Sequence, residues 1–239
     1  MSKQLPLNIS LRDFPSFENY VPGKNQEPVD RLKKLVTGTN EQEETDWLIY
    51  LWGASGCGKT HLLEAICRQA GHAGTNSLLV SLKRQSDNSP EVLEELSRIA
   101  VVCIDDVHCI AGSRDWETAL FALCEQRRQT RQLLVLSANN NANYLGLSLP
   151  DLATRMAGWG LSFPLQGLDD EEKFAVVKQR ARNRGIDVGD DVVRYVLNRY
   201  PRDMQALFKL LEQVDQCSLA SQRRVTIPFL KTLELEDAR

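Results

Sequence analysis

The sequence lacks the features that mark secreted, disulfide-rich or membrane proteins. Its six cysteines are scattered without a C-x-x-C pair, which argues against both a disulfide framework and a zinc site. No apolar run approaches the roughly 20 residues that cross a bilayer, and the start, MSKQLPLNIS, lacks the apolar core of a secretory signal. We therefore expect a cytoplasmic protein with reduced thiols and no zinc.

The chain also lacks an excess of charge of either sign. Its 29 Lys+Arg and 32 Asp+Glu give a formal net charge of −3, and residues 167–239 carry 13 basic and 13 acidic side chains. Binding to nucleic acid through bulk positive charge is therefore not favoured. With 239 residues, 42% of them hydrophobic, the chain is long enough to bury a core as one large domain or two small ones.

Short apolar runs alternate with helical patterns through the first two thirds of the chain. Strand-length runs lie at WLIYLWG (47–53), SLLVSL (77–82), VVCIDD (101–106) and QLLVLSAN (132–139). Helices are expected before and between them, at about 27–36, 59–70, 90–99 and 116–129. This alternation predicts an α/β fold with a parallel sheet that helices cover on both faces.

After Gly167 only helical patterns follow. The first begins at the capping pair Asp169 and Glu172 and ends at Gly185, and two or three more helices complete the sequence. We therefore expect three parts: an extended, proline-containing tail over 1–20, an α/β nucleotide-binding subdomain over 21–166 and a helical subdomain over 167–239.

The most informative segment is GASGCGKT (53–60), which fits the G-x-x-x-x-G-K-[ST] pattern of a phosphate-binding loop. It follows an expected strand and opens an expected helix. Its glycines let backbone N–H groups turn toward phosphate oxygens, and the helix N-terminus adds partial positive charge. Lys59 would reach the β- and γ-phosphates, and Thr60 would hold Mg²⁺. The candidate nucleotide contacts are Gly53, Ala54, Ser55, Gly56, Cys57, Gly58, Lys59 and Thr60, with His61 directly after them.

Two carboxylates end the third expected strand, VVCIDD. Asp105 stands where the metal-holding carboxylate of a phosphate-loop protein (Walker B) is needed, beside the loop (Walker A). Asp106 takes the place of a water-polarising acid, although its side chain is shorter than that of Glu. Solvation at a sheet edge is the alternative for both acids. The pair indicates nucleotide binding with Mg²⁺, and we expect weak hydrolysis at most by this site.

Longer strings resemble a known family, the AAA+ ATPases of the DnaA branch. FENYVPGKNQ (17–26), CIDDVHCIAG (103–112) and LPDLATRMAGWG (149–160) carry the resemblance, and a helical region with an arginine follows them. Within that branch the chain most resembles the Hda group, whose members regulate the initiator DnaA. The resemblance runs from about residue 13 to residue 233. It implies a phosphate-loop AAA+ sheet followed by an all-helical lid.

The resemblance implies catalytic roles for two more residues. Asn139, at the end of LLVLSAN, matches sensor I, whose amide can bond the γ-phosphate or the attacking water; a polar turn is the alternative. Arg155, in LATR, matches the arginine finger, which acts across a subunit interface on a neighbour's nucleotide. A solvated arginine near a helix end is the alternative for Arg155.

Three further nucleotide contacts are implied in the same way. Arg202 matches sensor II, which reaches the bound phosphates from the lid. Tyr20 and Val21 resemble the segment that packs on the base in this branch, and ordinary core contacts are the alternative for both.

The N-terminal residues Gln4, Leu5, Leu7 and Ile9 resemble the sliding-clamp-binding peptide of the Hda group. An extended peptide of this kind offers the Gln4 amide for hydrogen bonds and alternate apolar side chains for a groove. Asn8 departs from the proline expected at its position, which would weaken pre-organisation of the peptide. A disordered terminus with incidental leucines is the alternative.

Together these residues imply an adaptor that restrains replication initiation. It would bind ADP or ATP with Mg²⁺ and dock on the sliding clamp, the β subunit of DNA polymerase III. It would then promote hydrolysis of DnaA-bound ATP through Arg155, without sequence-specific DNA or membrane binding. We expect a small oligomer such as a homodimer. Two alternatives stay open: a DNA-binding initiator or helicase-loader-like ATPase, and a ring-forming ATPase that remodels proteins.

Overall fold

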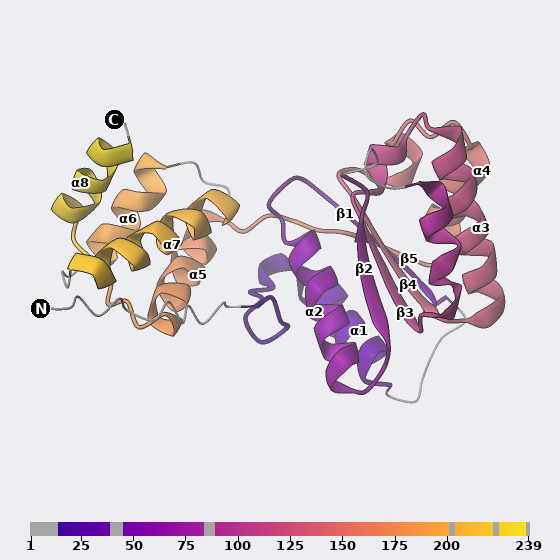
Figure 1. Ribbon diagram of the computed structural model, residues 1–239, viewed down its shortest axis with the longest axis horizontal. Helices are drawn as coiled ribbons and strands as arrows, with labels where there is room; N and C mark the ends of the chain where they lie inside the picture. The colour runs from indigo at the N-terminus through magenta and orange to yellow at the C-terminus, as the bar shows by residue number, and fades with distance from the viewer. Residues whose placement is uncertain (1–13, 39–44, 84–88, 201–203, 222–224, 238–239) are drawn as a thin grey trace, which may run out of the picture. The chain divides into compact units, whose positions relative to one another are not determined.

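The computed structural model describes residues 14–38, 45–83, 89–200, 204–221 and 225–237, which fall into two compact units (Figure 1). One unit is Pro15–Glu172, and the other contains the helices from Lys173 onward. Five of the candidate residues lie outside the described ranges: Gln4, Leu5, Leu7, Ile9 and Arg202.

A five-stranded parallel sheet forms the centre of the first unit, in the order β2-β3-β4-β1-β5. The strands are β1 (Leu48–Trp52), β2 (Ser77–Ser81), β3 (Val101–Asp105), β4 (Leu133–Ala138) and β5 (Leu161–Pro164). The predicted α/β fold is confirmed. The sequence prediction missed β5, because this edge strand has only four residues and none of them is fully buried.

Helices cover both faces of this sheet (Figure 1). They are α1 (Gln26–Thr37), α2 (Lys59–His72), α3 (Arg114–Thr130) and α4 (Pro150–Gly158). Successive side chains of a strand point to opposite faces. Ile49 and Leu51 accordingly join the core under α1 and α2, whereas Leu48 and Tyr50 join the core under α3 and α4. The phosphate loop, which opens α2, and Arg155 on α4 thus belong to helices on opposite faces of the sheet.

The helix predicted over 90–99 is wrong: two short 3₁₀ helices, Pro90–Leu93 and Glu95–Arg98, take its place. Leu93 and Leu96 are buried three residues apart, which is the repeat of a 3₁₀ helix. Arg127 of α3 also competes for the backbone here, because its Nη2 donates to the Leu96 carbonyl at 2.6 Å. Further 3₁₀ helices span Gly23–Asn25, Val107–Ile110 and Ala142–Tyr144.

The C-terminal unit is helical, as predicted. Its helices are α5 (Asp170–Asn183), α6 (Asp190–Arg199), α7 (Met204–Ser221) and α8 (Ile227–Asp237). The predicted start of α5 is confirmed, since the Glu172 N–H donates to the Asp169 side chain at 2.9 Å and the Asp169 N–H donates to Glu172 at 2.8 Å. Among the described helices, none combines the length and the apolar composition needed to cross a membrane.

Candidate functional site

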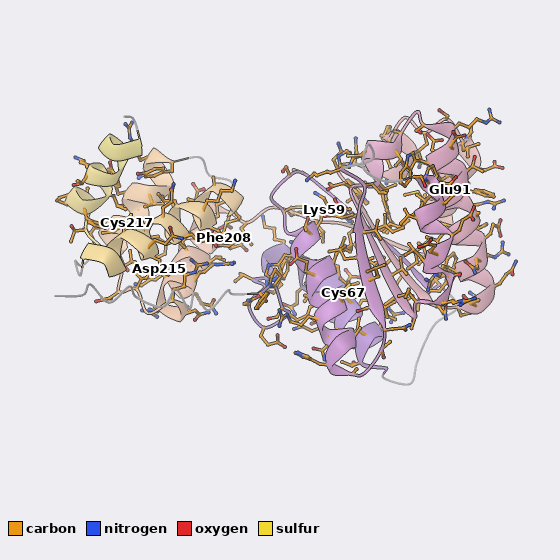
Figure 2. All side chains as sticks on the ribbon, viewed as in Figure 1. Lys59, Cys67, Glu91, Phe208, Asp215 and Cys217 are labelled. Carbon is orange, nitrogen blue, oxygen red and sulfur yellow. The ribbon has the colours of Figure 1, made fainter. Side chains whose placement is uncertain are left out.

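The phosphate loop connects β1 to α2 and holds its lysine close to the backbone. The Lys59 Nζ donates to the carbonyls of Gly53 at 2.8 Å and Ala54 at 2.9 Å, and lies 3.7 Å from the Cys57 Sγ. Figure 2 shows Lys59 in the first turn of α2. The loop therefore surrounds a positive charge whose hydrogen-bond acceptors are neutral, as a site for phosphate oxygens requires.

Glycine is required in this loop for two separate reasons. Gly56 and Gly58 have φ of 80° and 94°, in the left-handed region that other residues rarely adopt. A Cβ on Gly58 would also lie 2.7 Å from Cε2 of Tyr20, which is closer than atoms can approach. The motif glycines thus allow both the turn and the close approach of Tyr20.

Thr60 and Asp105 meet at the carboxyl end of β3. The Thr60 hydroxyl donates to Oδ2 of Asp105 at 2.6 Å, and the Ser137 hydroxyl donates to the other oxygen. A hydroxyl beside a carboxylate, next to a phosphate site, fits the oxygen ligands that Mg²⁺ takes when substrate phosphates and water complete its shell. Within the described ranges, no cluster of three or more His, Cys, Asp or Glu side chains could hold a metal ion by itself.

Asp106 faces a different set of charges. Its backbone takes the left-handed conformation with φ 60°, which Asp tolerates better than most residues. The Lys83 Nζ lies 3.1 Å from Oδ2 of Asp106, and the His108 Nδ1 lies 3.9 Å from Oδ1. Hydrogen bonding to Asp106 raises the pKa of Lys83 above its ordinary value. Asp106, the candidate water-polarising acid, is therefore held by a cation.

A further carboxylate lies near Asp105. Glu64 is one helical turn after Thr60 on α2, and burial together with the charge of Asp105 raises its pKa. Glu64 was missed by the sequence reasoning because it lies outside the loop pattern.

Tyr20 packs on the outside of the phosphate loop. Its hydroxyl donates to the Cys57 carbonyl at 3.4 Å, and its ring centroid lies 5.2 Å from that of His61. Burial raises the pKa of Tyr20 to about 12. The His61 Nε2 lies 3.0 Å from the Ser16 carbonyl, and Val21 is half-buried next to Tyr20 in the chain. The segment before α1 is thereby attached to the loop.

The remaining candidates fall in two places. Asn139 follows β4, which pairs with β1 and β3, so it lies at the same sheet edge as the loop and Asp105, with an exposed side chain. Arg155 lies on α4. Its Nη1 donates to Glu125, and its guanidinium carbon lies 4.0 Å from the Phe121 ring centroid and 4.4 Å from that of Trp159.

The partners of the candidate residues were not predicted from the sequence. Lys83, Ser137 and Glu125 are distant in sequence from the side chains that they contact, and no motif contains them. Only the parallel sheet order, which places β4 between β1 and β3, could have suggested Ser137 near Asp105.

Two family models match the chain, and together they cover most of it. Residues 11–163 match the bacterial DnaA ATPase domain, and residues 170–233 match the Hda lid domain. The ATPase-domain match implies that the phosphate loop takes an adenine nucleotide.

Solved structures with the same fold include two DnaA structures and one RuvB structure. Domain III of the replication initiation protein DnaA from Thermotoga maritima has a TM-score of 0.77 at 17% identity, covering 94% of this chain and 97% of that one. AMPPCP-bound DnaA from Aquifex aeolicus has a TM-score of 0.69 at 19% identity, covering 86% and 66%. A RuvB variant from Thermotoga maritima has a TM-score of 0.66 at 19% identity, covering 92% and 72%.

The matched structures differ in how much of their own length this chain spans. The chain spans about two thirds of the Aquifex DnaA chain and nearly all of the Thermotoga domain III. At identities below 20%, the similarity to these three structures shows the fold alone. The two family models identify the family of the chain. The chain belongs to the bacterial DnaA ATPase-domain family of AAA+ proteins, and with its Hda lid domain it is an Hda-like member.

Proposed function

We propose that this Hda-like chain is an adaptor that promotes hydrolysis of ATP bound to DnaA and thereby restrains initiation of replication. It binds its own adenine nucleotide with Mg²⁺, docks on the sliding clamp through Gln4, Leu5, Leu7 and Ile9, and presents Arg155 to the nucleotide on DnaA. The Hda lid match and the DnaA ATPase-domain match support a regulator of this kind.

The chain's own residues have distinct tasks in its nucleotide site. Lys59 binds the phosphates, Thr60 and Asp105 hold the metal, and Asn139 contacts the terminal phosphate or water. Arg202 has the sensor II role that the resemblance implies. Bound Mg²⁺ neutralises phosphate charge. Because Lys83 lies 3.1 Å from Asp106, this acid is a poor acceptor for a water proton, which supports slow hydrolysis by the chain alone.

The observation that carries the proposal is the position of Arg155. It belongs to α4, which packs with α3 on the sheet face opposite to α2, while Lys59 opens α2. Its described contacts are with α3 and with Trp159 at the end of α4, and a quarter of its side chain is exposed. An arginine on this face is available to a second molecule, and an arginine supplied in trans can accelerate phosphoryl transfer by ~10³–10⁵ in other systems.

The test is ATP hydrolysis by DnaA in the presence of clamp-loaded DNA, with the adaptor added. Arg155→Ala should lower the stimulated rate by about 10³-fold, while its nucleotide affinity and circular dichroism spectrum stay those of the wild type. Arg114→Ala, which removes an exposed arginine at the start of α3, is the matched control. Full stimulation by Arg155→Ala would overturn the assignment of Arg155.

The clamp contact has its own test. Deletion of residues 2–9, or the double change Leu7→Ala and Ile9→Ala, should abolish capture of the adaptor by immobilised clamp and leave nucleotide affinity unchanged. Gln4→Ala and Leu5→Ala should weaken capture less, since each removes one contact. Capture by the deleted chain at the wild-type level would remove the tail from the proposal.

A binding measurement separates this proposal from a DNA-binding initiator or helicase loader. Those proteins gain affinity from phosphate contacts, so their binding falls steeply with salt. With a net charge of −3, this chain should show no salt-dependent affinity for duplex or single-stranded DNA in the absence of the clamp. Tight, salt-sensitive binding to bare DNA would favour the alternative.

A further inference from the structure

The Arg155 side chain is held on three sides by its own protein. Its guanidinium lies against the rings of Phe121 and Trp159, at 4.0 Å and 4.4 Å from their centroids, and Nη1 donates to the Glu125 carboxylate. Arg155 and Glu125 remain accessible, with 25% and 34% of their side chains exposed. We refer to Phe121, Glu125 and Trp159 as the Arg155 cradle.

The cradle belongs to one face of α3 that also fixes α4. Glu117, Phe121 and Glu125 follow one another at four-residue steps, so they share a face of the helix. The fully buried Glu117 carboxylate accepts hydrogen bonds from the N–H groups of Ser148 at 3.0 Å and Leu149 at 2.7 Å, immediately before α4. The same face therefore sets where α4 begins and where the Arg155 side chain lies.

The two kinds of contact in the cradle have different consequences. Ring faces attract a guanidinium and orient its plane, but they do not neutralise its charge. A carboxylate neutralises the charge and occupies the N–H donors that a phosphate would use. The rings can stay in contact while Arg155 binds a phosphate, whereas Glu125 and the phosphate compete for the Nη1 donors and repel each other.

We propose that Phe121 and Trp159 are positioning residues for Arg155 and that Glu125 is a competing carboxylate that makes Arg155 selective for the more highly charged nucleotide. Arg155 exchanges one anion for another, and no covalent bond changes. A nucleoside triphosphate displaces Glu125 because it has one phosphate more and a larger total negative charge, while a diphosphate displaces it poorly. This inference rests on the proposed function, since it concerns the arginine that acts on DnaA-bound ATP.

The solvent exposure of the pair keeps this competition small enough to reverse. Both partners are partly exposed to solvent, which weakens an ion pair, so removal of Glu125 should change binding by only a few-fold. Once Arg155 leaves, Glu125 is solvated again and no buried charge remains unpaired. The carboxylate thus discriminates between anions without preventing the exchange.

The functional test uses Glu125→Gln and Phe121→Leu in the stimulated hydrolysis of DnaA-bound ATP. Glu125→Gln should lower the adaptor concentration for half-maximal stimulation about threefold, with the maximal rate unchanged. It should also increase binding to ADP-loaded DnaA more than binding to ATP-loaded DnaA. Phe121→Leu should instead lower the maximal rate about fivefold, because the guanidinium loses a contact that orients it. Glu125→Asp, which keeps the charge, should restore discrimination.

A matched control removes a comparable ion pair elsewhere. Glu212 lies 3.2 Å from the Arg184 Nη2 in the helical unit, so Glu212→Gln removes one carboxylate from an arginine pair outside the cradle. It should leave both the half-maximal concentration and the maximal rate at the wild-type level. Equal stimulation curves and equal ADP/ATP discrimination for Glu125→Gln and wild type would overturn the competing role.

A second measurement needs no DnaA. Phenylglyoxal modifies accessible guanidinium groups, and the adduct at Arg155 can be followed by peptide mass spectrometry on the full chain. Arg155 should react about threefold faster in Glu125→Gln than in the wild type, while the adduct at Arg114 forms at the same rate in both. Unchanged reactivity of Arg155 would overturn the competition. If reactivity rises but the wild type never stimulates DnaA, the competition stands and the proposed function fails.

Discussion

The phosphate loop and the Arg155 cradle each hold one positive charge, but with acceptors of different kinds. Lys59 donates to two neutral carbonyls five and six residues before it in the chain. Arg155 donates to a carboxylate on another helix, thirty residues away. When Lys59 turns to a phosphate, the acceptors that it leaves are neutral carbonyls. When Arg155 turns to a phosphate, it leaves the negatively charged Glu125 carboxylate without its cation. The loop therefore accepts phosphate readily, and the cradle discriminates between anions.

The largest expected effect is on nucleotide binding by the phosphate loop. Lys59→Ala should weaken adenine nucleotide binding about 100-fold, because a charge-assisted contact to phosphate is worth about 2–3 kcal/mol. Isothermal titration with ADP and with ATP measures the change, and Lys59→Arg should not restore it because a planar guanidinium does not fit the same carbonyls. Wild-type affinity in Lys59→Ala would show that the loop does not carry phosphate binding.

The next effect is on stability and concerns the cradle side. Glu117→Gln should lower the free energy of unfolding by about 2 kcal/mol and the Tm by about 4–8 °C, because a buried carboxylate that accepts three backbone N–H groups is replaced by an amide. Thermal unfolding followed by circular dichroism measures this, with Asp115→Asn on the exposed side of α3 as the control.

The destabilisation caused by Glu117→Gln should be confined to the region around α4. Amide hydrogen exchange should increase in Pro150–Gly158 and remain unchanged in the loop at 53–60, since Glu117 contacts the start of α4 and not the loop. Equal increases in both regions would mean that the two sites are mechanically one unit. An unchanged Tm would contradict the role assigned to Glu117.

The same contrast explains which part of the site could be predicted from the sequence. The geometry of the loop depends on residues within one short segment, Gly53–Thr60, so the pattern and its flanking strand and helix were sufficient to locate it. Asp105 was located by the buried run before it, because carboxyl ends of parallel strands meet at one edge. The capping pair Asp169 and Glu172 was equally local and is confirmed.

The rest depends on contacts between distant elements, which no local pattern records. Ser137 reaches Asp105 only because β4 lies between β1 and β3, and Glu125 reaches Arg155 only because α3 and α4 share a face of the sheet. The segment 90–99 has helical spacing, but the Arg127 side chain donates hydrogen bonds to the carbonyls of Leu96 and Ile99. These tertiary contacts override the local preference for an α-helix.

A smaller effect concerns the ion pair between Lys83 and Asp106, on the phosphate-loop side. Lys83→Met removes the exposed cation beside the buried Asp106 carboxylate and should raise hydrolysis by the chain's own site about threefold, which corresponds to about 0.7 kcal/mol for an ion pair with one solvent-exposed partner. Lys24→Met, at an exposed lysine in the Gly23–Asn25 turn, is the control. Phosphate release without DnaA measures the rate, and a rate that falls would assign Lys83 to nucleotide binding instead.

The smallest expected effect tests whether Tyr20 is part of the loop or only covers it. Tyr20→Phe loses a long hydrogen bond of 3.4 Å to the Cys57 carbonyl, so at neutral pH the free energy of unfolding should fall by about 0.5 kcal/mol. In alkali the order of stability should reverse, so that Tyr20→Phe becomes more stable than the wild type. The unfolded chain releases the phenol proton near pH 10, while the folded chain holds it to about pH 12, so the wild type loses stability across this interval and Tyr20→Phe does not lose that part. Urea unfolding of both chains at pH 7.5 and pH 10.5 measures the crossing. A constant difference between the two would show that the phenol is solvated, and hence that Tyr20 lies over the loop without being buried against it.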